Sequence, residues 1–163
     1  MRPILLTLAF VSLLGACSPS GTPQLEGMPD VGVPAQHVNT EIRLWAPEEL
    51  NSFKVNEPIW LAVEVVGKED VVFPRDYGNR MFRYADGDWG EVENVPTDWG
   101  EGYFLLSPSN GDPMEWGAPR VFPWFESVDA PILLRILVVG TRYRGGVATD
   151  EKVGAFVDVA LHQ

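Results

Sequence analysis

Apolar and polar residues alternate along most of the chain beyond residue 39. The pattern begins in residues 40–45 and is clearest in residues 57–66, where every second side chain is apolar. Shorter alternating or apolar runs follow at residues 71–73, 79–84, 89–94, 103–106, 120–122, 132–139 and 153–161. A period of two is typical of a strand with one buried face, and no run holds a helical period beyond about two turns. The pattern therefore predicts about seven to nine short strands.

Turn-forming residues separate these runs. Pro47 follows the first run and Pro74 ends the run at residues 71–73, because proline cannot donate to a strand ladder. Asp86 and Gly87 lie between two alternating runs, where glycine accommodates the positive φ of a tight hairpin turn. The number and spacing of strands predict an all-β fold, a single antiparallel β-sandwich over residues 39–163.

The order of these features resembles the Ig-like domains of exported bacterial proteins. The resemblance depends on an opening strand, the phrase Lys54-Val55-Asn56-Glu57-Pro58-Ile59 before a long core strand, a hairpin, and two long closing strands. The paired cysteines and the tyrosine corner of antibody domains are absent from the sequence. The resemblance implies an Ig-like β-sandwich and no particular activity.

A different pattern precedes this domain. Arg2 is followed by an apolar run at residues 4–14, shorter than the roughly 20 residues of a membrane-spanning helix. One positive charge, a short apolar run and then small residues are typical of a secretory signal peptide. The run leads into Leu14-Gly15-Ala16-Cys17, which resembles the lipobox of bacterial lipoproteins.

This resemblance implies that residues 1–16 are removed as a signal peptide and that Cys17 becomes the lipidated N-terminus. More than one acyl chain gives durable anchoring, since a single chain binds membranes only marginally. We therefore expect the protein on the extracytoplasmic face of a bacterial cell envelope, and on the outer membrane if the host has one. The alternatives are a transmembrane or buried helix that contains an ordinary cysteine, or a sequence that is not cleaved.

Residues 17–38 separate the expected anchor from the first strand. From residue 18 onward they contain four prolines and three glycines and show no apolar periodicity. This composition predicts a tether, with a reach of about 25 Å if it behaves as a coil.

Composition limits the classes of function. The chain has 163 residues, with 23 Asp and Glu against 12 Lys and Arg, for a net charge of -11. One domain of this size has enough apolar residues for a core, and its acidic balance argues against a nucleic-acid partner. Lipidation of Cys17, the one cysteine, would leave no thiol for a disulfide or a nucleophile.

Motifs for enzymatic chemistry are absent from the sequence. It has no nucleophile elbow, zinc-protease motif, phosphate loop or dinucleotide fingerprint. Its two histidines are His37, in the expected tether, and His162, the penultimate residue, and neither is placed to meet a catalytic-triad partner or a second metal ligand. We expect a non-enzymatic protein with no cofactor and no metal. A calcium site near Asp86 and Asp88 is an alternative, since short acidic loops supply oxygen ligands, although a hairpin turn explains the same residues. A small hydrolase is a distant alternative.

The middle third of the chain is acidic and aromatic. Between Arg83 and Arg120 there are eight Asp or Glu residues and no Lys or Arg. Tryptophan and tyrosine are frequent interface anchors, and loops carry recognition in a sandwich. The candidate binding residues are Trp89, Asp98, Trp99, Glu101, Tyr103, Glu115 and Trp116. In the competing interpretation these rings close the ends of the sandwich and the acids only solvate it.

A second, smaller indication comes from the strands. Trp45 and Trp60 share the register of charged residues in their runs, so they are expected on outward faces, as contact residues or beneath loops. Together these features favour a lipid-anchored binding or scaffold module that contacts a protein or an envelope polymer through its acidic aromatic loops. The alternative is a carbohydrate-binding or calcium-dependent module.

Overall fold

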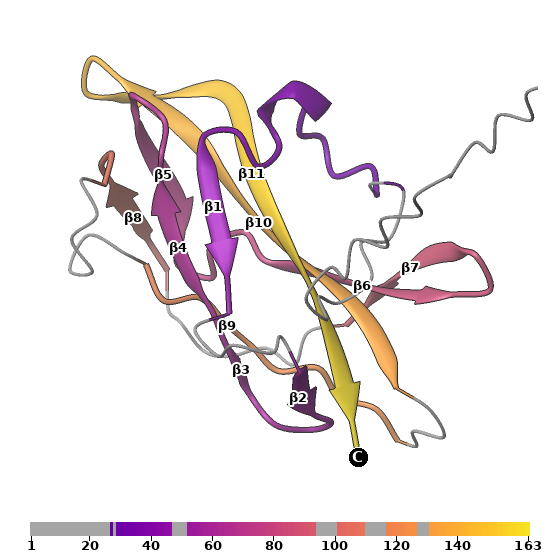
Figure 1. Cartoon of the computed structure of the whole chain (residues 1–163). Helices are drawn as coiled ribbons and strands as arrows, with labels where there is room; N and C mark the ends of the chain where they lie inside the picture. Colours follow the sequence, from indigo (N-terminus) through magenta and orange to yellow (C-terminus); the bar gives the residue numbers. More distant parts are fainter. Residues whose placement is uncertain (1–26, 28, 47–51, 94–100, 110–116, 127–130) are drawn as a thin grey trace, which may run out of the picture.

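The computed structural model describes residues 27, 29–46, 52–93, 101–109, 117–126 and 131–163. These residues form eleven strands and one short 3-10 helix, η1 (Ala35–His37) (Figure 1). None of the described residues belongs to a helix with the length and hydrophobicity that a membrane crossing requires. The expected all-β, sandwich-like fold is confirmed.

The first layer is a seven-stranded sheet. It contains β2 (Ser52–Lys54), β5 (Asp70–Pro74), β6 (Arg80–Ala85), β7 (Asp88–Val92), β8 (Tyr103–Leu106), β10 (Ile132–Arg144) and β11 (Val147–His162). Its order is β2-β11-β10-β5-β8, while β6 pairs with both β10 and β7. All pairs are antiparallel except β11 with β2, which is parallel and so departs from the expected antiparallel arrangement.

The second layer is smaller and combines two strand pairs. Strand β1 (Ile42–Trp45) pairs with β4 (Ala62–Val65), and β3 (Ile59–Trp60) pairs with β9 (Arg120–Val121). Reciprocal backbone hydrogen bonds between Val63 and Gly117, of 3.0 and 2.8 Å, join the two pairs. Figure 1 shows β1 in front of the long β10–β11 hairpin.

The core lies between the two layers. In the second layer the alternating apolar residues of 57–66 all point inward, as predicted, and are almost completely buried: Ile59, Leu61, Val63 and Val65. They meet the inner face of the first layer, which contributes Val71, Phe73, Met81, Leu134, Ile136, Val138, Val153, Ala155, Val159 and Leu161. Burial of these side chains is the main force that holds the layers together.

Several strand boundaries differ from the expected ones. The described residues contain eleven strands, more than the predicted seven to nine, because the run at residues 57–66 divides into β3 and β4 on either side of Leu61 and because β2 forms beside the C-terminus. The predicted hairpin at Asp86 and Gly87 is confirmed, with positive φ angles of 54° and 87°. The closing strands are longer than expected, since they form one hairpin through Gly145 and Gly146, whose φ angles are 58° and 86°.

Residues 27 and 29–39, called here the N-terminal strap, run from the outer face of the first layer, where the Gly27 carbonyl accepts a hydrogen bond from Arg135, to the edge of β11. Val38 forms a parallel bridge with Gly154, and the N–H of Asn39 donates to the Gly154 carbonyl at 2.9 Å. The Asn39 side chain accepts a hydrogen bond from the Phe156 N–H, also at 2.9 Å. The strap overlaps the last part of the expected tether, whose boundary with the domain stays a prediction.

Candidate functional site

The predicted binding residues are only partly described. Cys17, Asp98, Trp99, Glu115 and Trp116 lie outside the described residues. Glu101 is exposed and comes just before β8, and Tyr103 at the start of β8 is 73% exposed. Trp89 lies on β7, at the opposite end of the first layer from β8 (Figure 1). The structure therefore does not bring Trp89 together with Tyr103.

Trp89 is half-buried because it covers a buried charge. The Arg135 side chain, only 1% exposed, forms an ion pair with Asp158 in which the nitrogen–oxygen distances are 2.7 and 2.8 Å. Its guanidinium lies 4.4 Å from the Trp89 ring centroid and 3.9 Å from that of Phe156, and it also donates to the Gly27 carbonyl of the strap. These contacts satisfy a charge that would otherwise be costly to bury.

An open cavity of about 330 Å³ lies on the β6–β7 hairpin beside Trp89. Its lining combines Arg83, Ala85, Asp88, Trp89, Gly90, Glu91 and Val92. The only paired charge in this lining is Glu91, which binds Arg80 through two 2.7 Å hydrogen bonds. Within the described parts of the chain, no group of three or more His, Cys, Asp or Glu side chains is placed to hold a metal ion.

The second layer carries an aromatic surface on its outer side. Ile59 and Val121 are opposite each other and fully buried, so their neighbours Trp60 and Arg120, also opposite each other, point outward. The alternation continues beyond β9, since Pro119, Val121 and Pro123 are buried while Arg120, Phe122 and Trp124 are not. We call Trp60, Arg120, Phe122 and Trp124 the aromatic face.

The aromatic face has two large exposed rings. Trp60 is 51% exposed and Trp124 is 56% exposed. The Phe122 and Trp124 rings are nearly parallel, at 23°, with centroids 6.5 Å apart. The extended segment from Arg120 to Trp124 spans roughly 13 Å. This surface is a row of rings with a cation in it, and not a closed pocket.

Backbone and side-chain hydrogen bonds hold this row in place. Leu61 N–H donates to the Pro119 carbonyl at 3.0 Å, which extends the β3–β9 ladder. At the other end, Asn56 donates to the Phe125 carbonyl at 3.1 Å and accepts from the Phe125 N–H at 2.9 Å. The backbone beneath the exposed rings is therefore fixed before any partner binds, which lowers the entropic cost of binding.

Trp45 and Arg43 extend the outer side of the second layer. Arg43 lies opposite Glu64 in the β1–β4 register and binds it at 2.7 Å, which explains how Glu64 is buried on an outward face. The Arg43 guanidinium lies 4.5 Å from the Trp45 ring centroid. The outward placement predicted for Trp45 and Trp60 agrees with their registers and exposure.

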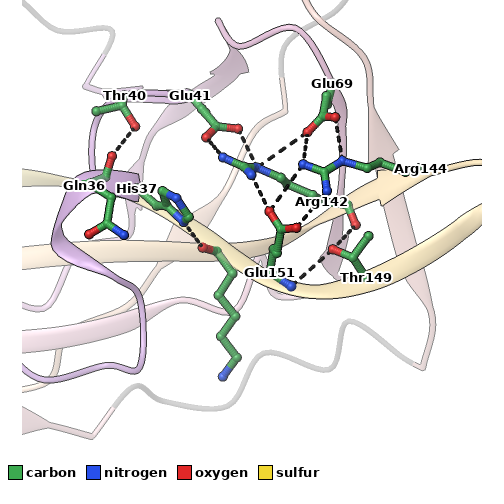
Figure 2. Close-up of polar contacts among 10 residues, drawn as sticks. Gln36, His37, Thr40, Glu41, Glu69, Arg142, Arg144, Thr149 and Glu151 are labelled. Carbon is green, nitrogen blue, oxygen red and sulfur yellow. Dashed lines mark hydrogen bonds and ion pairs between the residues drawn. The ribbon is translucent and has the colours of Figure 1, made fainter.

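A separate charged cluster lies where the β10–β11 hairpin meets β1 and β5. Figure 2 shows Arg142 and Arg144 surrounded by three carboxylates. Arg142 pairs with Glu41 and Glu151, while Arg144 binds Glu69 at 2.5 and 2.7 Å and Glu151 at 2.7 Å. Hydrogen bonds from Arg144 lower the pKa values of Glu69 and Glu151 below their ordinary range. Because the three carboxylates pair with both arginines, the cluster connects neighbouring strands and offers a ligand no unpaired arginine.

The sequence pattern predicts one part of the aromatic face and not the rest. The alternation of its strand places Trp60 outward. Phe122 and Trp124 lie in a proline-containing segment with a weak strand pattern, so their shared face depends on pairing with β3, which is distant in sequence. The available signal was the alternation of Arg120, Phe122 and Trp124 with Pro119, Val121 and Pro123.

Comparisons with known proteins do not assign a family. No family model matches the chain, and no curated protein matches its sequence. One solved structure, titled "AvmM Catalyzes Macrocyclization in Alchivemycin A Biosynthesis", is similar over 77% of this chain and 91% of its own, with 14% identity and a TM-score of 0.30. A similarity at that level supports no inference about the activity of this chain, so its function has to be argued from the aromatic face.

Proposed function

We propose that the protein is a non-enzymatic binding module, held on the extracytoplasmic face of a bacterial envelope by a lipid on Cys17. An Ig-like domain would present its binding surface to a protein or an envelope polymer. The lipobox-like sequence Leu14-Gly15-Ala16-Cys17 supports the anchor, and the all-β fold suits a rigid display scaffold. Outer-membrane placement follows if the host has two membranes.

The observation that carries the binding role is the aromatic face. Trp60 and Trp124 each leave about half of their surface in water, although the core beneath them is complete without them. Exposed aromatic rings on a fixed backbone are typical of interaction surfaces, where tryptophan often provides the largest energy on binding. The acidic aromatic loops remain a second candidate surface, with Glu101 and Tyr103 as their described members.

In situ photo-crosslinking tests this function. Replacing Trp124 with the photo-reactive residue benzoylphenylalanine keeps a large ring on the aromatic face of the full-length protein in its own host. We expect irradiation to produce a defined adduct with a protein or an envelope polymer. The matched control carries the same photo-reactive residue in place of Val147, which is 63% exposed at the far end of the β10–β11 hairpin.

Adducts at position 124 and none at position 147 would support the binding role of the aromatic face. Equal adducts at both positions, or none at either, would contradict it. The composition of the adduct separates a protein partner from a polysaccharide. Metabolic labelling with a palmitate analogue checks the anchor in the same cells, since Cys17→Ala should abolish the label.

A further inference from the structure

Arg120 differs from the other shielded arginines of the described chain. Of the arginines that are not exposed, Arg80, Arg135 and Arg142 all pair with a carboxylate. Arg120 has no ion pair among the described residues, and its buried Nε atom lacks a hydrogen-bond partner. Among the described residues, the half-buried Arg120 guanidinium has no carboxylate partner, and a buried donor atom of this kind usually has a partner.

Arg120 lies within the aromatic face, so its guanidinium, which has no ion pair among the described residues, is next to the exposed rings. Its guanidinium lies 5.1 Å from the Trp60 ring centroid, and Phe122 follows two residues later on the same face. Guanidinium groups bind carboxylates with paired hydrogen bonds, and the bond is stronger where rings exclude water. A ligand for this face therefore needs flat apolar surfaces for the rings and a carboxylate close to one of them.

A sugar ring with a carboxylate has both properties. One face of such a ring consists of C–H groups, which pack against aromatic rings, while its carboxylate and hydroxyls accept hydrogen bonds. A peptide in an extended conformation fits less well, because backbone groups of this region are already used between Leu61 and Pro119 and between Asn56 and Phe125.

We infer that the aromatic face binds a saccharide chain that carries carboxylates, with sugar rings on Trp60 and Trp124 and a carboxylate on Arg120. This inference rests on the proposed binding function and names its ligand class. The ligand is thus an acidic polysaccharide of the uronic-acid type. The row from Arg120 to Trp124 is long enough to contact more than one sugar ring.

Titration calorimetry with two oligosaccharides tests the inference. The full-length protein in detergent micelles is titrated with a hexamer of galacturonic acid and with cellohexaose, a neutral hexamer of similar shape. We expect the acidic hexamer to bind on the order of tenfold more tightly, and its affinity to fall as salt rises. Arg120→Gln should remove the preference, whereas Trp124→Ala should weaken both ligands on the order of tenfold.

Matched variants exclude general damage. Arg75→Gln removes another arginine that stacks on a ring, and Val147→Ala shortens an exposed apolar side chain far from the face, so both should bind like the wild type. Unchanged far-UV circular dichroism confirms that each variant is folded. Binding of neither hexamer, equal binding of both, or a preference that persists in Arg120→Gln would overturn the inference. A protein adduct at position 124 in the cross-linking experiment would support the proposed binding function but contradict the saccharide ligand.

Discussion

At the scale of single residues, Arg135 is a buried charge that the described fold has to pair and shield from water. It lies directly opposite Asp158 on the neighbouring strand, and the two point away from the core onto the outer face of the first layer. Two rings and the strap carbonyl of Gly27 then remove the guanidinium from water. A buried pair of this kind contributes little net stability compared with apolar residues, but loss of one partner leaves an uncompensated charge.

Removal of Asp158 should therefore be far more damaging than removal of both partners. We expect Asp158→Ala to lower the free energy of unfolding by about 3–5 kcal/mol. The double variant Arg135→Met with Asp158→Leu should lose much less, because it buries no charge. Urea unfolding followed by tryptophan fluorescence measures both changes.

The exposed pair of Arg80 and Glu91 is the control for this comparison. Its side chains are 37% and 52% exposed, so Glu91→Ala should cost at most about 1 kcal/mol. A loss in Asp158→Ala no larger than in Glu91→Ala would show that the buried pair is not the constraint we describe.

At the scale of secondary-structure elements, turns and strand faces can be predicted from neighbouring residues, whereas pairing between strands distant in sequence cannot. The turn at Asp86 and Gly87 and the inward row that includes Val63 follow from neighbouring residues, so the sequence predicted them. The pairing of β2 with the C-terminal end of β11 has no local signature, since Ser52 and Ala160 are partners across more than a hundred residues. The Gly145-Gly146 turn was a local signal that sequence reasoning did not use.

The candidate site shows the same division. The outward position of Trp60 follows from period two, but its neighbour Arg120 reaches it only through the β3–β9 pair. Trp89 was predicted as a binding residue from its acidic surroundings, yet in the structure it covers Arg135. Composition alone could not reveal this contact, because the charge that Trp89 covers is on β10.

The charged cluster of the β10–β11 hairpin should make stability depend on pH. The Arg144 side chain lowers the pKa values of Glu69 and Glu151, whose ordinary value is 4.5. A carboxyl group with a lowered pKa in the folded protein stabilises it fully above the ordinary pKa. This contribution disappears as the pH falls from about 4.5 through the lower folded values.

Thermal unfolding between pH 7 and pH 3 measures the effect. We expect the double variant Glu69→Gln with Glu151→Gln to lose less melting temperature than the wild type as the pH falls below about 4.5. Both carboxylates are about a third exposed, so the difference should be modest and should shrink in high salt. Identical pH profiles for the two proteins would contradict this role.

At the scale of the whole molecule, the strap is part of the folded unit. It gives Arg135 a hydrogen-bond acceptor, pairs with β11 through Val38, and places Asn39 against Phe156. The first layer thus has a cover on its outer face, while the second layer exposes its rings. Residues 39–163 contain all the strands of the described residues but lack most of this cover.

Truncation tests how much the strap contributes to the stability of the strands. We expect residues 39–163 to fold as a mostly β unit and to unfold at a lower denaturant concentration than residues 27–163. The difference arises because the shorter fragment leaves the Arg135 guanidinium without the Gly27 carbonyl and opens its surroundings to water. Equal denaturation midpoints for the two fragments would show that the strap adds nothing to stability.

The strap also determines the length of the linker between the domain and a membrane. From Cys17 to Asn39 an extended chain could cover about 75 Å, but from Cys17 to Gly27 it covers at most about 35 Å. That distance is comparable to the diameter of a domain of this size. With the anchor proposed at Cys17, the chain leaves the domain on the outer face of the first layer, opposite the aromatic face. A short linker on the first layer keeps that layer near the membrane. The exposed tryptophans of the second layer would then face away from the lipid, toward the polymer beyond it.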